Sequence, residues 1–164
     1  MCGIVGFIAK DHFDFIPVLG DMIDCINHRG PDDKGVWVDA NNGVGLGHAR
    51  LSILDLSSAG HQPMNSMSSR FTIVFNGEIY NHKSLRKELN NCGVLDWKGW
   101  SDTEVLLMAI ETWGIDLTLK KIIGMFAFAV WDKQQRTLTI VRDRMGEKPV
   151  YYGWINGNFV FDLS

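Results

Sequence analysis

The segment 125–131, Met-Phe-Ala-Phe-Ala-Val-Trp, decides the fold because it contains no polar residue. Side chains of a strand point alternately to opposite faces, and a sheet with one wet face therefore shows alternating apolar and polar residues. In 125–131 both alternating sets are apolar, so neither face of this strand is suited to water. The segment predicts a strand that lies between two layers of the fold.

Further short apolar segments on both sides of this strand predict a protein rich in strands. They comprise residues 2–9, 36–38, 44–53, 71–75, 137–142, 150–154 and 159–161. The turn-forming residues Asn41-Asn42-Gly43 and Asn156-Gly157 each join two of these segments and predict hairpins. The strand 71–75 is expected to stop at Asn76-Gly77, because this pair is also turn-forming.

Segments with apolar residues at helical spacing predict helices at 16–27, 81–89 and 117–122, with another helix beginning at Ser101. Ser101 and Glu104 have the spacing of a capping box, and an asparagine is expected to cap the helix 81–89. Hairpin-connected strands with a few amphipathic helices favour an α+β fold of antiparallel sheets covered by helices. The chain has no repeat or linker, so it is expected to form one unit.

The composition argues against several classes of protein. The chain has 164 residues and a net charge of −3 without a basic run, which argues against nucleic-acid binding. Its apolar segments are far shorter than the ~20 residues of a membrane-spanning helix. Residues 4–9 lack the features of a signal peptide, so the mature chain is expected to begin near residue 1. Three cysteines without a C-x-x-C pair fit a cytoplasmic location.

Metal and nucleotide sites are not indicated by the sequence. The five histidines have neither HExxH nor Cys/His ligand spacing, so no metal site is expected. The chain has no G-x-x-x-x-G-K motif, and the alternating glycines of 43–47 lie in a predicted strand rather than before a helix. We therefore expect no cofactor in this chain.

Cys2 is the most suggestive candidate for a nucleophile. Removal of Met1 would leave a thiol and a free α-amine on the same residue. An α-amine titrates near ~7.7 to 8.0 and a thiol near ~8.5, so the amine can accept the thiol proton without a histidine base. The alternative interpretation is a small buried cysteine that simply begins the first strand.

Asn76 and Gly77 could supply two hydrogen-bond donors to an oxyanion, one from the side-chain amide and one from the adjacent backbone N–H. Such a pair suits acyl transfer, where one donor typically stabilises the transition state by ~3 to 4 kcal/mol. Asn-Gly is also the commonest short hairpin turn, so an ordinary turn is the alternative interpretation.

Arg50 and Asp102 are candidates for binding a substrate that carries both charges. In the predicted strand 44–53, the side chains of His48, Arg50 and Ser52 share one face, and a guanidinium can hold a carboxylate through two parallel hydrogen bonds. Asp102, just inside a helix start, could pair with an ammonium group. The alternatives are a surface or ion-pair role for Arg50 and a favourable interaction of Asp102 with the helix dipole.

The segment 55–69 is polar and is interrupted by Gly60 and Pro63, so it predicts a surface loop. Loops of this length without secondary structure are uncommon and are often functional. We therefore expect that this segment could act as a lid.

Six ordered blocks covering nearly the whole chain resemble the glutaminase domain of class II glutamine amidotransferases, specifically the asparagine synthetase branch. The blocks are MCGIVG (1–6), HRGPD (28–32), HARLSI (48–53), NGEIYN (76–81), SDTE (101–104) and RDRMGEKPVYY (142–152). The resemblance implies an N-terminal nucleophile hydrolase fold, a four-layer αββα sandwich in which two antiparallel sheets lie between helical layers.

The resemblance also implies a reaction. Cys2 would attack the side-chain amide of L-glutamine, while Asn76 and the N–H of Gly77 hold the oxyanion and the α-amine of Cys2 transfers protons. Ammonia would leave, and water would cleave the resulting thioester to release glutamate.

The same resemblance implies how glutamine would be recognised. Arg50 would bind its α-carboxylate, and Glu78 and Asp102 would lie near its α-ammonium group. This pattern of opposite charges would discriminate glutamine from a simple amide.

Asparagine synthetases continue into a second domain that activates aspartate with ATP and carries an S-G-G-x-D-S loop, which this sequence lacks. We therefore expect this chain to be a fragment in which residues 1–164 form the glutaminase domain. ATP and Mg²⁺ are expected to bind only to the missing synthetase domain. That domain is the expected ammonia acceptor, and a homodimer is expected only for the full-length enzyme. Met145 stands at a position where the family more often has an aromatic residue. We expect this difference to affect the contact with the missing domain.

A non-catalytic domain of the same fold that docks on a synthetase partner is the competing hypothesis. Glutamine binding that weakens on substitution of Arg50 or Asp102 would favour the enzyme. An absence of binding in a chain that has already lost Met1 would favour docking.

Overall fold

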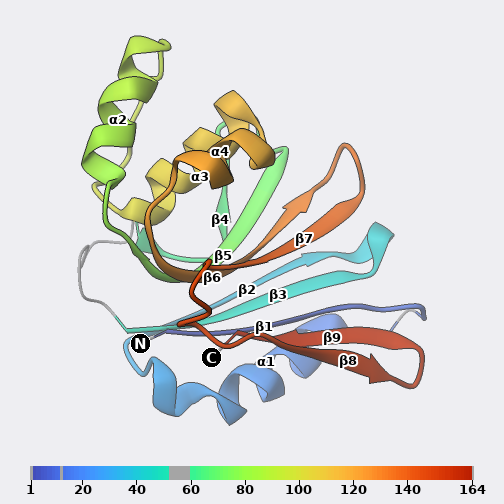
Figure 1. Ribbon diagram of the computed structural model, residues 1–164. Helices are drawn as coiled ribbons and strands as arrows, with labels where there is room; N and C mark the ends of the chain where they lie inside the picture. Colours follow the sequence, from blue (N-terminus) through green and yellow to red (C-terminus); the bar gives the residue numbers. More distant parts are fainter. Residues whose placement is uncertain (1, 12, 52–59, 164) are drawn as a thin grey trace.

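The computed structural model describes residues 2–11, 13–51 and 60–163. In this part of the chain, two antiparallel sheets are stacked face to face and helices cover the outer face of each (Figure 1). The arrangement confirms the expected α+β fold with two antiparallel sheets between helical layers.

The first sheet, sheet A, has the strand order β2-β3-β1-β9-β8. Its strands are β1 (Gly3–Ile8), β2 (Asp33–Asp39), β3 (Val44–Arg50), β8 (Tyr151–Ile155) and β9 (Asn158–Asp162). The second, sheet B, has the order β4-β5-β6-β7. Its strands are β4 (Met64–Asn65), β5 (Phe71–Ile79), β6 (Gly124–Asp132) and β7 (Thr137–Arg142).

Strand β6 lies between β5 and β7, and both of its faces are covered. Ala127, Ala129 and Trp131 pack with Leu46 in the apolar layer between the sheets. The alternate set, which includes Phe128, belongs to a separate cluster beneath the helices. The prediction that 125–131 forms a strand between two layers is therefore confirmed.

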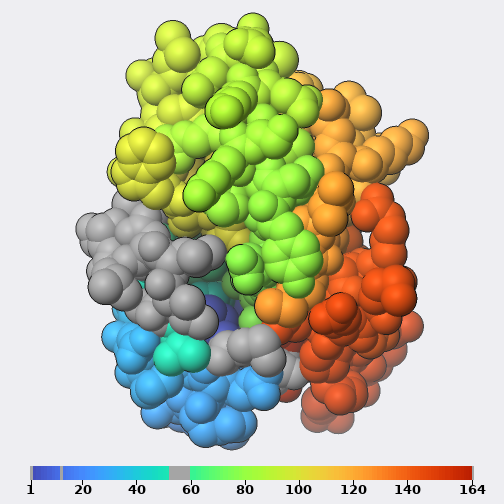
Figure 2. Space-filling view, turned by 60° about the vertical axis from the view of Figure 1, so that its left-hand side comes forward, coloured from blue at the N-terminus to red at the C-terminus, as the bar shows by residue number. Residues whose placement is uncertain are grey.

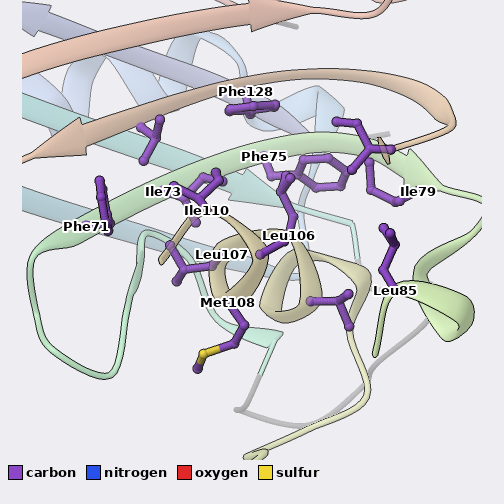
Figure 3. Packing of buried hydrophobic residues seen from close by; sticks show 14 of the residues in the cluster. Phe71, Ile73, Phe75, Ile79, Leu85, Leu106, Leu107, Met108, Ile110 and Phe128 are labelled. Atoms are coloured by element: carbon purple, nitrogen blue, oxygen red, sulfur yellow. The ribbon is translucent and has the colours of Figure 1, made fainter. Parts of the chain in front are cut away.

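Helices α2 (His82–Asn91), α3 (Asp102–Trp113) and α4 (Ile115–Lys121) lie on the outer side of sheet B (Figure 1). Leu106 and Ile110 of α3 form one apolar cluster with Phe75 of β5 and Phe128 of β6 (Figure 3). Residues 102–110 are all buried, which is expected for a helix that packs against a sheet on one side and other helices on the other. The start of α3 is thus fixed relative to β5.

Helix α1 (Phe15–Cys25) covers the outer face of sheet A and leads into a short 3₁₀ turn, η1 (Asn27–Arg29). Leu19 packs with Phe7 of β1, and Ile23 packs with Ala49 of β3. A second turn, η2 (Ala40–Asn42), joins β2 to β3. Within the described ranges, the helices fall short of the length and apolarity that a membrane crossing requires.

The expected end of a strand at Asn76-Gly77 is wrong. Strand β5 continues to Ile79, and Asn76 and Gly77 pair with Ala127 and Phe126. The neighbouring strand extends alongside this pair, so tertiary pairing overrides the local turn preference. The hairpin expected at Asn156-Gly157 does form, with positive φ at both residues.

The expected loop 55–69 contains the short strand β4, which the sequence did not predict. Residues 52–59, and with them the first part of the proposed lid (55–59) and Ser52 of the polar face, lie outside the described residues. Of the expected capping box, the serine half forms, because the Ser101 hydroxyl accepts the Glu104 N–H at 3.2 Å. The Glu104 carboxylate instead accepts the N–H groups of Lys98 and Gly99. Asn81 is the N-cap of α2 but makes no capping bond, since its side chain binds the N–H of Ile123 instead.

Candidate active site

A cavity of about 150 Å³ lies where the ends of sheets A and B meet the start of α3. All the site residues that the sequence singled out line it: Cys2, Arg50, Asn76, Gly77, Glu78 and Asp102. Figure 2 shows dark blue atoms of the N-terminal strand at the bottom of a hollow beside green atoms of the α2 region. The fold therefore gathers residues that are far apart in the sequence around one small cavity.

Cys2 directly precedes β1, and its side chain is half-buried. The N–H of Leu51 donates to Sγ at 3.4 Å, and Sγ lies 3.7 Å from the Leu51 carbonyl oxygen. This contact follows from the pairing of β1 with β3, which sets Gly3 opposite Ala49. The thiol lines the cavity and is held by the backbone of Leu51. Met1, whose removal the sequence hypothesis requires, lies outside the described residues.

Asn76 projects from β5 and is almost fully buried. Its Nδ2 donates to the carbonyl oxygen of Leu163 at 2.9 Å, and the N–H of Leu163 in turn donates to Ile4 of β1 at 3.0 Å. An amide nitrogen carries two hydrogens, so one can orient the group while the other serves a ligand. The side chain of Asn76 is thereby held at the wall of the cavity.

Gly77 has φ of +155°, and a Cβ at this position would collide with the carbonyl oxygen of Met125 and with Phe126 of the neighbouring strand. The close approach of β6 therefore requires glycine here. Residues 76 and 77 remain paired as part of β5, so their orientation is set by sheet B rather than by a flexible turn.

Asp102 is buried at the start of α3, with both carboxylate oxygens occupied. Oδ2 accepts the N–H of Ile79 at 2.9 Å, and Oδ1 accepts the N–H of Thr103 at 2.9 Å. Burial raises the pKa of Asp102 above its ordinary value, while these backbone donors oppose the rise. The carboxylate thus links α3 to the end of β5 and adds negative charge to the cavity wall.

Arg50, at the end of β3, is buried and lines the same cavity as Asp102. The half-buried side chain of Glu78 adds a second carboxylate. A cavity bordered by a guanidinium and by two carboxylates suits a ligand that carries one negative and one positive group.

His48, two residues before Arg50, is buried between the sheets. Its Nε2 lies 3.3 Å from the carbonyl oxygen of Phe75, while Nδ1 has no hydrogen-bond partner among the described residues. The pKa of His48 is lowered to about 4, chiefly by burial and also by the Arg50 guanidinium, while the hydrogen bond to Phe75 opposes the shift. At neutral pH the imidazole is therefore neutral and holds β3 against β5.

The sequence did not single out Gln62, Thr103 or Lys148, which also line the cavity. Lys148 is buried, and its backbone is held by the Asp143 carboxylate and the Arg142 side chain. Burial, followed by the nearby Arg29 guanidinium, lowers the pKa of Lys148. The position of Lys148 in the block 142–152 could have indicated that it belongs to the site, whereas no local sequence feature distinguishes Gln62.

The ranges that the structure describes contain no group of three or more His, Cys, Asp or Glu side chains arranged to bind a metal ion. The cavity's own groups are a thiol, amides, a guanidinium, an ammonium and carboxylates. This set provides a nucleophile, hydrogen-bond donors and charges for substrate binding, which together are suited to acyl transfer.

Comparisons with known proteins show similarity to one family along nearly the whole chain. Residues 1–163 match the family described as glutamine amidotransferase domain. Asparagine synthetase [glutamine-hydrolyzing] 3 of Bacillus subtilis (strain 168) is 39% identical over 165 residues, which cover 98% of this chain and 26% of that protein. Amidase chry2 of Gibberella zeae is 37% identical over 163 residues, covering 93% and 24% respectively. The chain thus spans about a quarter of the length of these relatives.

A solved structure has the same fold. Glutamine phosphoribosylpyrophosphate amidotransferase from B. subtilis, complexed with ADP and GMP, superposes with a TM-score of 0.79 at 21% identity. The match covers 98% of this chain and 41% of that one. At this level of identity the comparison supports the stacked sheets and their helical layers.

Proposed function

Because the chain belongs to the glutamine amidotransferase domain family, we propose that it hydrolyses the side-chain amide of L-glutamine to glutamate and ammonia. The observation that carries this proposal is the meeting of Cys2, Asn76, Gly77, Arg50 and Asp102 around one cavity. A thiol, a pair of oxyanion donors and two opposite charges are the parts that the reaction requires.

In the proposed reaction, Cys2 Sγ attacks the amide carbon of glutamine, and the thiol proton passes to the α-amine of Cys2 after removal of Met1. The carbonyl oxygen becomes an oxyanion, which accepts hydrogen bonds from Asn76 Nδ2 and the N–H of Gly77. The C–N bond breaks as the α-ammonium returns its proton to the departing nitrogen, and ammonia leaves. Water, deprotonated by the amine, then cleaves the thioester and releases glutamate and the thiol.

Recognition of glutamine would use the two ends of the cavity. Arg50 binds the α-carboxylate, and Asp102 and Glu78 attract the α-ammonium group. Because Asp102 is fixed by backbone N–H groups of β5 and α3, it can orient the substrate with little loss of side-chain entropy. This anchoring would place the side-chain amide near Cys2.

We further propose that the ammonia is passed to a synthetase domain that forms asparagine from aspartate in the cytoplasm. The short span of this chain relative to its asparagine synthetase relatives supports such a partner. In that assembly, ATP and Mg²⁺ would act in the synthetase domain, no cofactor would be needed in this chain, and the full-length enzyme would form a homodimer.

Release of glutamate from glutamine, measured with purified chain whose N-terminus is defined by intact mass, tests the proposal. Cys2→Ala is expected to abolish turnover, whereas Cys25→Ala, which alters an exposed cysteine on α1, should retain it. Hydroxylamine should divert the wild-type thioester to γ-glutamyl hydroxamate.

Turnover that survives in Cys2→Ala would reject the nucleophile. Full activity in a chain that retains Met1 would reject the amine as the base. Glutamine binding without any hydrolysis or hydroxamate in processed wild-type protein would contradict an enzymatic role.

A further inference from the structure

The backbone pairing of β4 with β5 ends just short of the proposed oxyanion donors. Met64 pairs with Ile73 and Asn65 with Thr72, so the same register would set residue 62 opposite Phe75. Strand β4 begins only at Met64, after Pro63, whose nitrogen has no hydrogen to donate. Phe75, which directly precedes Asn76, therefore lacks a backbone partner from β4.

The side chain of Gln62 occupies this position. Its Oε1 accepts the N–H of Phe75 at 2.6 Å, and its Nε2 lies 3.4 Å from the Phe75 carbonyl oxygen. A carboxamide offers the same acceptor and donor as a peptide group, so it can replace the backbone of a strand residue. Gln62 is almost fully buried, as an amide with these partners can be.

Gln62 also connects β5 to the other walls of the cavity. Nε2 lies 3.4 Å from Thr103 Oγ1, next to Asp102 at the start of α3. The backbone of Gln62 packs so closely on Gly35 of β2 that a side chain at position 35 would collide with the Gln62 carbonyl oxygen. One residue therefore contacts both sheets and α3.

We propose that Gln62 is a positioning residue whose amide fixes the backbone of β5 immediately before Asn76 and Gly77, and so aims the oxyanion donors. The inference rests on the proposed glutamine hydrolysis. Gln62 acts through β5, because a displacement at Phe75 would be transmitted directly to the two residues that follow it. A misplacement of about 1 Å in such a site can lower the rate on the order of 100-fold.

The experiment compares wild type, Gln62→Leu and Gln62→Glu, with Gln135→Leu as a control at an exposed glutamine. Leucine has a similar volume but cannot replace either hydrogen bond to Phe75. We expect its kcat for glutamine to fall roughly 10- to 100-fold with little change in KM, because Arg50 and Asp102 still bind the substrate ends. The rate of Cys2 alkylation by iodoacetamide should match wild type, since the thiol contacts Leu51 instead.

The pH dependence of Gln62→Glu separates positioning from a general role in folding. A protonated glutamic acid has one donor and one acceptor, like the amide, and burial raises the pKa of a carboxyl group. We expect the kcat of this variant, as a fraction of wild type at the same pH, to rise as the pH falls. The fraction for Gln62→Leu should stay low throughout.

Three outcomes would overturn the proposal. One is a folded Gln62→Leu with wild-type kcat. Another is a parallel loss of kcat, Cys2 alkylation and melting temperature, with no recovery of Gln62→Glu at low pH, which would assign Gln62 to folding alone. Wild-type protein that does not hydrolyse glutamine would reject the proposed function itself, and the positioning role with it.

Discussion

Strands β6 and β8 are both rich in apolar and aromatic residues, yet they lie in opposite surroundings. Phe128 of β6 has no exposed surface, whereas Trp154 of β8 exposes 73% of its surface. We call sheet B with α2–α4 and its contact with sheet A the closed side, and the β8–β9 hairpin the open side. The boundary between the two sides lies within sheet A, where β9 of the hairpin pairs with β1.

The difference shows that burial depends on neighbours rather than on composition. Strand β6 has a strand on each edge, α3 on one face and sheet A on the other. In the described structure, β8 pairs only with β9 and is exposed along most of its length. The cavity borders β5 and α3 on the closed side, which suits a site that must hold donors and charges in fixed positions.

The largest expected effect comes from removing a ring on the closed side. Phe128→Ala should lower the free energy of unfolding by about 3 to 5 kcal/mol, because it leaves a cavity within a densely packed cluster. Urea denaturation followed by circular dichroism measures this change. A loss below about 1 kcal/mol, the level typical of surface positions, would break the contrast between the two sides.

The next largest effect is the contribution of His48, buried between the sheets, to the pH dependence of the free energy of unfolding. Its pKa in the folded chain is about 4, against an ordinary 6.5. Between these values the unfolded chain binds a proton that the folded chain excludes, so stability falls as the pH falls from 6.5 to 4. The loss amounts to about 3 kcal/mol.

Denaturation of His48→Gln across this range measures that contribution. The variant should show a shallower fall in stability with decreasing pH than wild type. His28→Gln, at an exposed position, should keep the wild-type slope. Equal slopes for His48→Gln and wild type would mean that His48 is not held neutral between the sheets.

A pair of glycine substitutions compares the backbones of the two sides. Gly77→Ala places a methyl group against β6 at a positive φ, and we expect a loss of about 1 to 3 kcal/mol together with lost glutamine hydrolysis. Gly153→Ala in β8 meets no atom within 4 Å, so its stability should remain near wild type. Thermal melting of both variants tests the pair, and equal losses would contradict the comparison.

The smallest effect is expected for a ring on the open side. Trp154 packs edge-on against Phe159, with ring centroids 5.4 Å apart, and otherwise extends into solvent. Trp154→Ala should therefore cost about 1 kcal/mol or less, measured by the same urea titration as Phe128→Ala. A cost that equals that of Phe128→Ala would show that β8 is enclosed in solution.

Much of the fold could be predicted because the residue types of several segments indicate the environment in which each segment lies. The segment 125–131 is apolar on both faces and forms the enclosed β6, and Asn156-Gly157 forms its hairpin. Ser101 was predicted to cap α3 and does so. The prediction that the strand ends at Asn76-Gly77 was wrong, because the turn preference of this pair does not reveal that β6 lies alongside and accommodates a glycine.

The candidate site was predicted less evenly. Cys2, Arg50, Asn76 and Asp102 stand in recognisable blocks, and their functional groups suggest roles that remain predictions. Gln62 could not be found in the same way, since the role of its amide depends on a hydrogen bond with the backbone of Phe75, 13 residues away in the sequence.

By itself, the sequence determined most of the strand and helix segments, which groups are available for chemistry, and the family to which the chain belongs. The tertiary structure decided that β5 continues through Asn76-Gly77, that Gln62 completes the edge of that strand, and that β6 is enclosed while β8 is exposed. The reason is physical: residue type fixes what a group can bind or bury. Only the stacking of two sheets and their helices determines which partners lie within hydrogen-bonding or packing distance.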